Sequence, residues 1–70
     1  MITTEQIRSR LIEVIKQSGL QQKDIAAILN IKPQSVQQYM SGRSMPSLEN
    51  LANLCKALDI DTNYILCQDD

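Results

Sequence analysis

The stretch "QKDIAAILNIKPQSVQQYMSG", residues 22–42, contains two short helical patterns separated by only three residues. The first pattern covers residues 22–29, and its apolar side chains fall on one broad face, as in a helix that packs on a core. Asn30 can adopt the left-handed conformation that ends a helix, and Pro33 suits the first position of the next one. The sequence therefore predicts helices over 22–29 and 33–41, joined by a tight turn.

The second helix of this stretch has two different faces. At about 100° per residue, four polar side chains fall within one arc, and three larger apolar side chains occupy the opposite side. The polar group is Gln34, Gln37, Gln38 and Ser41, and the apolar group is Val36, Tyr39 and Met40. Gly42 is placed to end the helix. Two short helices joined in this way have the geometry of a helix-turn-helix, here over residues 22–41.

The rest of the chain is also helical by its capping and spacing signals. Thr3 begins a capping box, and the apolar spacing after it predicts a helix over roughly 4–18. Ser47 is an N-cap for a fourth helix that extends to about residue 58, and Asp61 caps a last short helix. We therefore expect an all-α fold, a compact bundle of five helices.

Length and residue types limit the possible functions. A chain of 70 residues has room for one domain, residues 1–70, with a modest core. It contains no histidine, which removes the commonest general base and any Cys-His or Ser-His pair. Cys55 and Cys67 cannot supply the four or so ligands of a zinc site. Gly19 and Gly42 stand too far apart for a phosphate-binding loop. We expect a protein that is not an enzyme and has no metal or cofactor.

The N-terminus and the hydropathy pattern predict a cytoplasmic protein. No apolar run approaches the roughly 20 residues that a membrane span needs. The first ten residues, "MITTEQIRSR", lack the apolar centre of a signal peptide. No membrane partner is expected.

The charges are distributed unevenly along the chain. The net charge is −1, but residues 1–58 hold seven basic and four acidic side chains, which leaves +3, and residues 59–70 hold only acidic ones. A mildly basic body can present a local positive face to phosphate. The role of Lys23, in the first turn of the helix over 22–29, stays undecided. Four further cations are interpreted as solvated: Arg8, Arg10, Lys16 and Lys56.

Two segments, "GLQQKDIAAILNIKPQSVQQYMSG" and "MPSLENLANLCKALDIDTNYIL", together resemble the Cro and phage-repressor family, also called the xenobiotic-response-element or lambda-repressor-like family. The resemblance covers nearly the whole chain. It implies a compact bundle of five helices that binds operator DNA as a symmetric homodimer, most often to repress transcription. From the resemblance we expect a bacterial or phage-encoded protein that is associated with the nucleoid when bound to DNA.

By this resemblance, helix 33–41 is the recognition helix, and Gln34, Gln37 and Gln38 face base edges. A glutamine amide suits this role because it can pair bidentately with adenine. Lys32 adds a cation near the DNA backbone. The resemblance implies phosphate contacts at four more residues: Gln22, Ser41, Arg43 and Asn50.

The chain departs from the family pattern at three places. Pro33 stands where many relatives have a polar base reader, and Lys32 stands where they have a Ser or Thr cap. Many relatives bury an arginine of the first helix against a glutamate of the third, and Ile15 and Met40 occupy those positions here. Replacing both charges by apolar groups avoids stranding a buried charge. We therefore predict that Ile15 and Met40 are in contact.

Two alternatives stay open. Three glutamines on one side of an isolated helix usually indicate a solvated face, but the helix-turn-helix context favours base readout. The chain is then a DNA-binding regulator, or a protein-interaction adaptor, for example antitoxin-like, that keeps the fold with weak or no DNA binding. The acidic pI of 5.2 favours the adaptor, and the clustered glutamines favour the regulator. The apolar group at residues 64–66 is interpreted mainly as core, with part of it available for a dimer contact.

Overall fold

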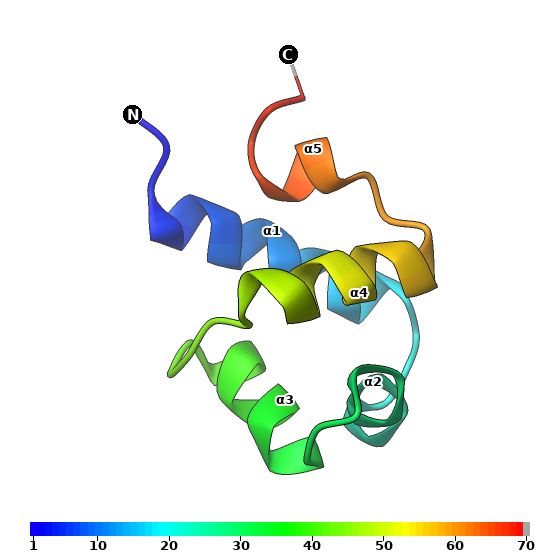
Figure 1. Cartoon of the computed structure of the whole chain (residues 1–70). Coiled ribbons are helices and arrows are strands. Elements are labelled where there is room, and N and C mark those ends of the chain that lie inside the picture. Colours follow the sequence, from blue (N-terminus) through cyan, green and yellow to red (C-terminus); the bar gives the residue numbers. More distant parts are fainter. Residues whose placement is uncertain (70) are drawn as a thin grey trace.

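A computed structural model describes residues 1–69, and these residues form helices and connecting turns with no strand among them. The five helices, in chain order, are α1 (Thr4–Gln17), α2 (Gln22–Leu29), α3 (Pro33–Ser41), α4 (Leu48–Leu58) and α5 (Thr62–Ile65) (Figure 1). The predicted all-α class is confirmed. The predicted bounds of the second and third helices agree with the structure, and the first helix ends one residue earlier than predicted.

The helices begin where side chains satisfy their free backbone N–H groups. The hydroxyl of Thr3 accepts from the N–H of Gln6 at 3.3 Å, and the Gln6 amide oxygen accepts from the N–H of Thr3 at 2.8 Å, which completes the predicted capping box. Ser47 caps α4 through the N–H of Asn50 at 3.1 Å. Asp61 caps α5 in the same manner. These local bonds explain why the sequence predicted the helix starts so closely.

The helices surround one aliphatic core. Helix α2 packs against α3 and α4, and α1 packs against α5 and α3. In Figure 1, α2 and α3 form one end of the molecule, and both chain termini lie at the other end. The buried core side chains come from all five helices: Leu11, Ile15, Ile25, Ala26, Leu29, Val36, Tyr39, Leu51, Leu54, Cys55 and Ile65. This core fixes the orientation of α3.

Ile15 and Met40, the two positions that the resemblance matches to a charge pair, lie in apolar surroundings. Ile15 is 3% exposed and belongs to the core, and Met40 is half-buried and packs against the core cluster. Ile15 is buried, and Met40 is partly buried. Direct contact between Ile15 and Met40 stays a prediction, which a double-mutant cycle can test.

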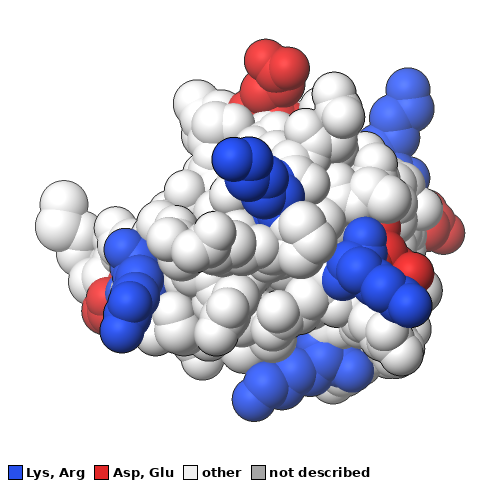
Figure 2. Space-filling model, turned by 90° about the horizontal axis from the view of Figure 1, so that it is seen from below, with Lys and Arg blue, Asp and Glu red and all other residues white. Residues whose placement is uncertain are grey.

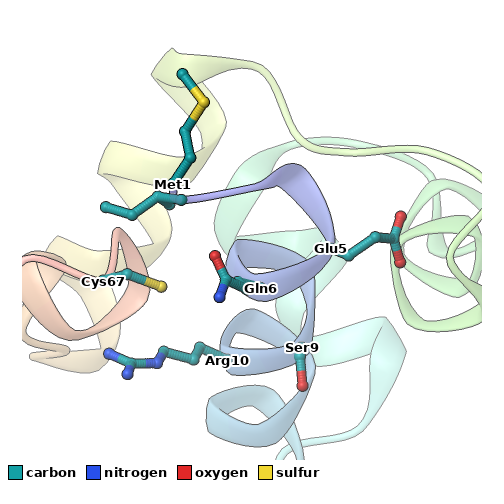
Figure 3. Close-up of a pocket in the computed structure, with 7 residues that line it drawn as sticks. Met1, Glu5, Gln6, Ser9, Arg10 and Cys67 are labelled. Carbon is teal, nitrogen blue, oxygen red and sulfur yellow. The ribbon is translucent and has the colours of Figure 1, made fainter.

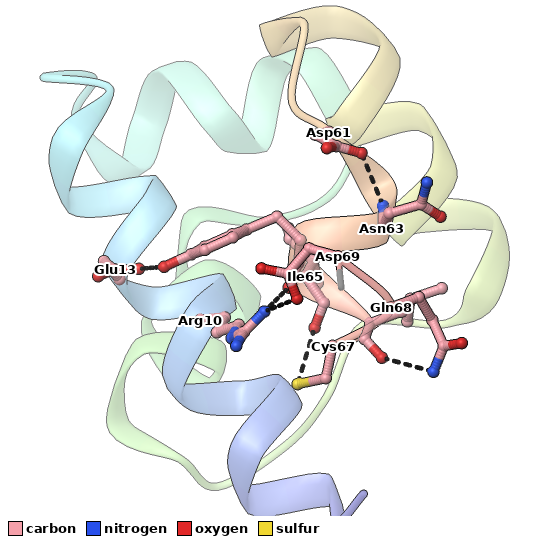
Figure 4. A network of polar contacts seen from close by, with 10 residues as sticks. Arg10, Glu13, Asp61, Asn63, Ile65, Cys67, Gln68 and Asp69 are labelled. Carbon is pink, nitrogen blue, oxygen red and sulfur yellow. Dashed lines mark hydrogen bonds and ion pairs between the residues drawn. The ribbon is translucent and has the colours of Figure 1, made fainter.

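A group of polar contacts, which we call the C-terminal clasp, ties α5 and the following segment to α1. Nη1 of Arg10 donates to the backbone carbonyl of Tyr64 at 2.7 Å and to the carboxylate of Asp69 at 2.8 Å, and the hydroxyl of Tyr64 donates to Glu13. Figure 4 shows these contacts between the two parts of the chain. The hydrogen bond from Arg10 holds the pKa of Asp69 below its ordinary value. The hydrogen bond to Glu13 raises the pKa of Tyr64, because the neutral hydroxyl is the donor.

The interpretation of Arg8 and Arg10 as solvated side chains was wrong. Arg10 belongs to the clasp, and its guanidinium carbon lies 4.6 Å from the centroid of the Tyr64 ring. The side chain of Arg8 is only 19% exposed and forms an ion pair with Glu5. Arg10 finds its partners through the packing of α1 against α5, which residue spacing cannot reveal, whereas Arg8 and Glu5 lie three residues apart on α1.

Candidate nucleic-acid interface

The turn between α2 and α3 sets the position of α3. Asn30 adopts the predicted left-handed conformation with φ of +55°, and the N–H of Ile31 donates to the carbonyl of Ala26 at 3.0 Å. Ile31 is half-buried and packs against the core. Lys32 is extended and makes no side-chain cap, and Pro33 occupies the first turn of α3, as predicted. The turn therefore holds α3 against α2 by backbone bonds and one apolar side chain.

The two faces of α3 are separated as the sequence predicted. On the inner face, Val36 is fully buried and Tyr39 is 7% exposed. The four side chains of the outer face, which we call the glutamine edge, are all exposed: Gln34, Gln37, Gln38 and Ser41. Because packing occupies the opposite face, the glutamine edge is the side of α3 that can meet a partner.

The glutamine edge and Arg43 surround a shallow depression of about 190 Å³. Gly42 ends α3 with φ of +82°, and the N–H of Arg43 donates to the carbonyl of Gln38 at 2.9 Å. These features turn the chain back, so that Arg43 lines the same depression as the glutamines. Five of the eight residues predicted as DNA contacts are thus brought together in one place.

The other three predicted contacts lie outside this depression. Gln22 is exposed at the first position of α2, and Lys32 is exposed immediately before α3. Asn50 is half-buried in the first turn of α4, where its backbone N–H serves the cap of that helix. The structure therefore leaves these three residues as separate positions that do not line the depression.

The side chains that line the depression suit a polyanion that also carries hydrogen-bond donors and acceptors. Each glutamine amide offers two N–H donors and a carbonyl acceptor, so that it can pair with a base edge that presents both kinds of group. The guanidinium of Arg43 can form a charge-assisted bond to a phosphate oxygen. The hydroxyl of Ser41 donates to the carbonyl of Gln38 at 3.2 Å and retains its acceptor capacity. No acidic side chain lines this depression.

The charge around this end of the molecule is mixed rather than uniformly positive. Figure 2 views the molecule from below the orientation of Figure 1, from the end formed by α2 and α3. Lys and Arg side chains are spread over this face with uncharged surface between them, and acidic groups lie toward its margins. Such a distribution supplies separate positive points for phosphates rather than one broad basic patch.

A larger hollow of about 600 Å³ lies elsewhere, between the start of α1 and the C-terminal segment. Figure 3 shows Gln6, Arg10 and Cys67 among the residues that line it. Cys55 and Cys67 are both free thiols. Over the part of the chain that the structure describes, no group of His, Cys, Asp or Glu is arranged to hold a metal. None of the described helices is long and apolar enough to cross a membrane.

One residue beside the interface escaped the sequence analysis. Arg8 of α1 lies next to Gly42, at the C-terminal end of α3. No local motif links these residues, because they come from different helices. The sequence signal for Arg8 was its position beside the apolar stripe of α1. A solvent-exposed cation can occupy the same kind of position, so this signal did not identify the contact.

Comparison with known proteins places the chain among DNA-binding domains. A family model described as Helix-turn-helix matches residues 11–65, which include all of α2, α3 and α4. Multiprotein-bridging factor 1a of Arabidopsis thaliana is 36% identical over 61 residues, which cover 81% of this chain and 43% of that relative. The chain therefore spans less than half the length of this relative. No solved structure matches the chain at a significant level.

Proposed function

We propose that this chain, which belongs to the Cro/C1-type helix-turn-helix family, is a sequence-specific regulator of transcription that binds double-stranded DNA. Membership of the family supports a DNA-binding role. The proposal adds sequence specificity, a palindromic operator, a homodimer on that operator and repression as the usual outcome. It also assigns residues 1–70 to one DNA-binding domain that acts in the cytoplasm.

One observation carries the proposal: the glutamine edge and Arg43 share one open depression on the outer side of α3. Gln34, Gln37 and Gln38 are assigned to base edges in the major groove. Pro33 provides no side-chain donor, so these three amides carry the base readout. The buried inner face of α3 supports this role, because a rigid helix presents its outer side chains in a fixed geometry.

The phosphate contacts are assigned to residues around that edge: Gln22, Lys32, Ser41, Arg43 and Asn50. They lie at the ends of helices or in the first turns of helices, where side chains and backbone N–H groups reach the DNA backbone in helix-turn-helix proteins. Two copies on a palindrome would contact half-sites about 10–10.5 bp apart.

Selection of bound sites from random duplexes tests the proposal. An enriched palindrome with this half-site spacing supports a dimeric, sequence-specific regulator. A salt series with Arg43→Ala then tests the phosphate contact, because the slope of log affinity against log salt should fall by about one. Lys56→Ala on α4 is the matched control and should keep the wild-type slope. A protein that binds no duplex in a salt-dependent manner contradicts the proposal.

A second candidate is a protein-interaction adaptor with the same fold. The name of the plant relative describes a factor that bridges several proteins. Leu48, at the first position of α4, is 84% exposed and offers an apolar contact to a protein partner. For an adaptor, Leu48→Ala should weaken capture of a protein partner, and Gln38→Ala should leave it unchanged. For a regulator, Gln38→Ala should weaken binding to DNA, and Leu48→Ala should leave that binding unchanged.

A further inference from the structure

Arg8 lies in an unusual position for a surface arginine. Its side chain is 19% exposed, whereas that of its ion-pair partner Glu5 is 78% exposed. The Nε of Arg8 is buried and has no hydrogen-bond partner among residues 1–69. The ion pair with Glu5 engages Nη1, and leaving the Nε donor buried without a partner is unfavourable, so a second interaction contributes to holding the side chain there.

That interaction lies at the C-terminal end of α3. A Cβ placed on Gly42 would be 3.5 Å from Cδ and 3.9 Å from Nε of Arg8, so the arginine packs on the residue that ends α3. The C-terminus of a helix carries partial negative charge and favours a nearby cation. Helix α3 has no basic residue in its own last turn. Arg8 therefore supplies from α1 the cation that α3 lacks.

We infer that Arg8 is a positioning residue for the DNA interface. It fixes the last turn of α3 against α1 and thereby fixes Arg43, which directly follows Gly42 and lines the depression. The inference rests on the proposed function for its effect on DNA, but the contact with α3 can be tested without DNA.

Arg8 supplies a polar contact between α1 and α3. Ile15 and Met40, the other pair predicted to join these two helices, are both apolar, so no ion pair joins α1 to α3 at those positions. Arg8 lies before the residues that match the family model, which begin at residue 11. It provides a polar link between α1 and α3 at a different place, beside Gly42.

Amide hydrogen exchange tests the contact directly. Arg8→Met keeps an apolar stem and removes the guanidinium. We expect exchange at the amides of Arg43 and Ser44, which both donate to the carbonyl of Gln38, to rise about threefold to tenfold by local opening. Lys16→Met removes the same charge from an exposed position of α1 and should change these rates less than about twofold. An equal rise at all core amides, or no rise at Arg43 and Ser44, overturns the inference.

Affinity for the selected duplex tests the consequence. Arg8→Met should weaken binding about threefold to tenfold in the wild-type background and change it little in the Arg43→Ala background, since the two residues act as a unit. An equal loss in both backgrounds would mean that Arg8 contacts phosphate itself, which overturns the positioning role. If the wild-type protein binds no duplex, the proposed function fails, and the exchange rates still decide the role of Arg8.

Discussion

The guanidinium of Arg10 covers the ring of Tyr64, with its carbon atom 4.6 Å from the ring centroid, and joins α1 to α5. The same guanidinium holds Asp69, so one side chain binds an aromatic ring, a backbone carbonyl and a carboxylate. Tyr64 in turn donates its hydroxyl to Glu13 of α1. In so small a domain, such a clasp adds to a core that is limited by chain length.

The pair of Arg10 and Asp69 makes the stability depend on pH in the acid range. The pKa of Asp69 is lowered in the folded protein from 3.8, its ordinary value. The pair therefore stabilises the fold above that value, and the contribution is lost as the pH falls through the lowered pKa. Asp69→Asn should lower the Tm at neutral pH by a small amount and converge with wild type once the pH is below the lowered pKa of Asp69. Glu49→Gln, at an exposed position outside the clasp, is the control, and a pH-independent difference for Asp69→Asn would contradict the prediction.

The hydroxyl of Tyr64 should ionise at a higher pH than a free tyrosine. Its hydrogen bond to Glu13, with burial and the nearby carboxylate charge, raises the pKa. This bond stabilises the fold below the ordinary tyrosine pKa and is lost as the pH rises through the raised value. Ultraviolet titration of wild type and Tyr64→Phe isolates the Tyr64 component by difference. In Glu13→Ala the Tyr64 component should move down toward the ordinary value, and an unchanged titration would show that the bond does not form in solution.

Burial predicts opposite outcomes for two leucines. Leu11 is fully buried, and Leu11→Ala should reduce the free energy of unfolding by about 2–5 kcal/mol, which is enough to unfold much of a small domain. Leu48 is 84% exposed, and Leu48→Ala should change stability by less than about 0.5 kcal/mol. Chemical denaturation of both variants measures the difference. Similar losses at the two positions would contradict the packing described for α1.

A double-mutant cycle tests the predicted contact between Ile15 and Met40. Each single change to Ala should destabilise the domain, with the larger loss at the more buried Ile15. If the side chains touch, the loss in the double variant should differ from the sum by about 0.5 kcal/mol or more. Additive losses would show that the two side chains do not interact. They would also contradict the alignment of Ile15 and Met40 with the charge pair that the resemblance implies.

The helix bounds could be predicted from the sequence because their signals are local. The capping box at Thr3, the left-handed Asn30 and the terminating Gly42 each act through bonds that span at most a few residues. The amphipathic pattern of α3 likewise showed which side would be buried and which would be exposed. One local feature was missed: Asp59 ends α4 in the left-handed conformation, a place where glycine or asparagine is the usual signal.

The contacts between distant parts of the chain could not be predicted in this way. Arg10 and Asp69 are 59 positions apart, and Arg8 meets Gly42 only because α1 packs against α3. The sequence does not distinguish a solvated cation from one that contacts another helix, because both interrupt the apolar pattern of their own helix. The sequence predicted the part of the candidate interface whose residues lie on α3 and in the turn that follows it.

If the glutamine edge reads bases, Gln38→Ala should lose affinity for one duplex sequence and not for another. On the duplex selected by the wild-type protein, the variant should lose about 1–3 kcal/mol of binding free energy. On a random duplex it should lose little, and its salt slope should stay that of wild type. Gln17→Ala, at the exposed end of α1, should bind both duplexes as wild type does. Equal losses on both duplexes, or no loss on the selected one, would contradict base readout by Gln38.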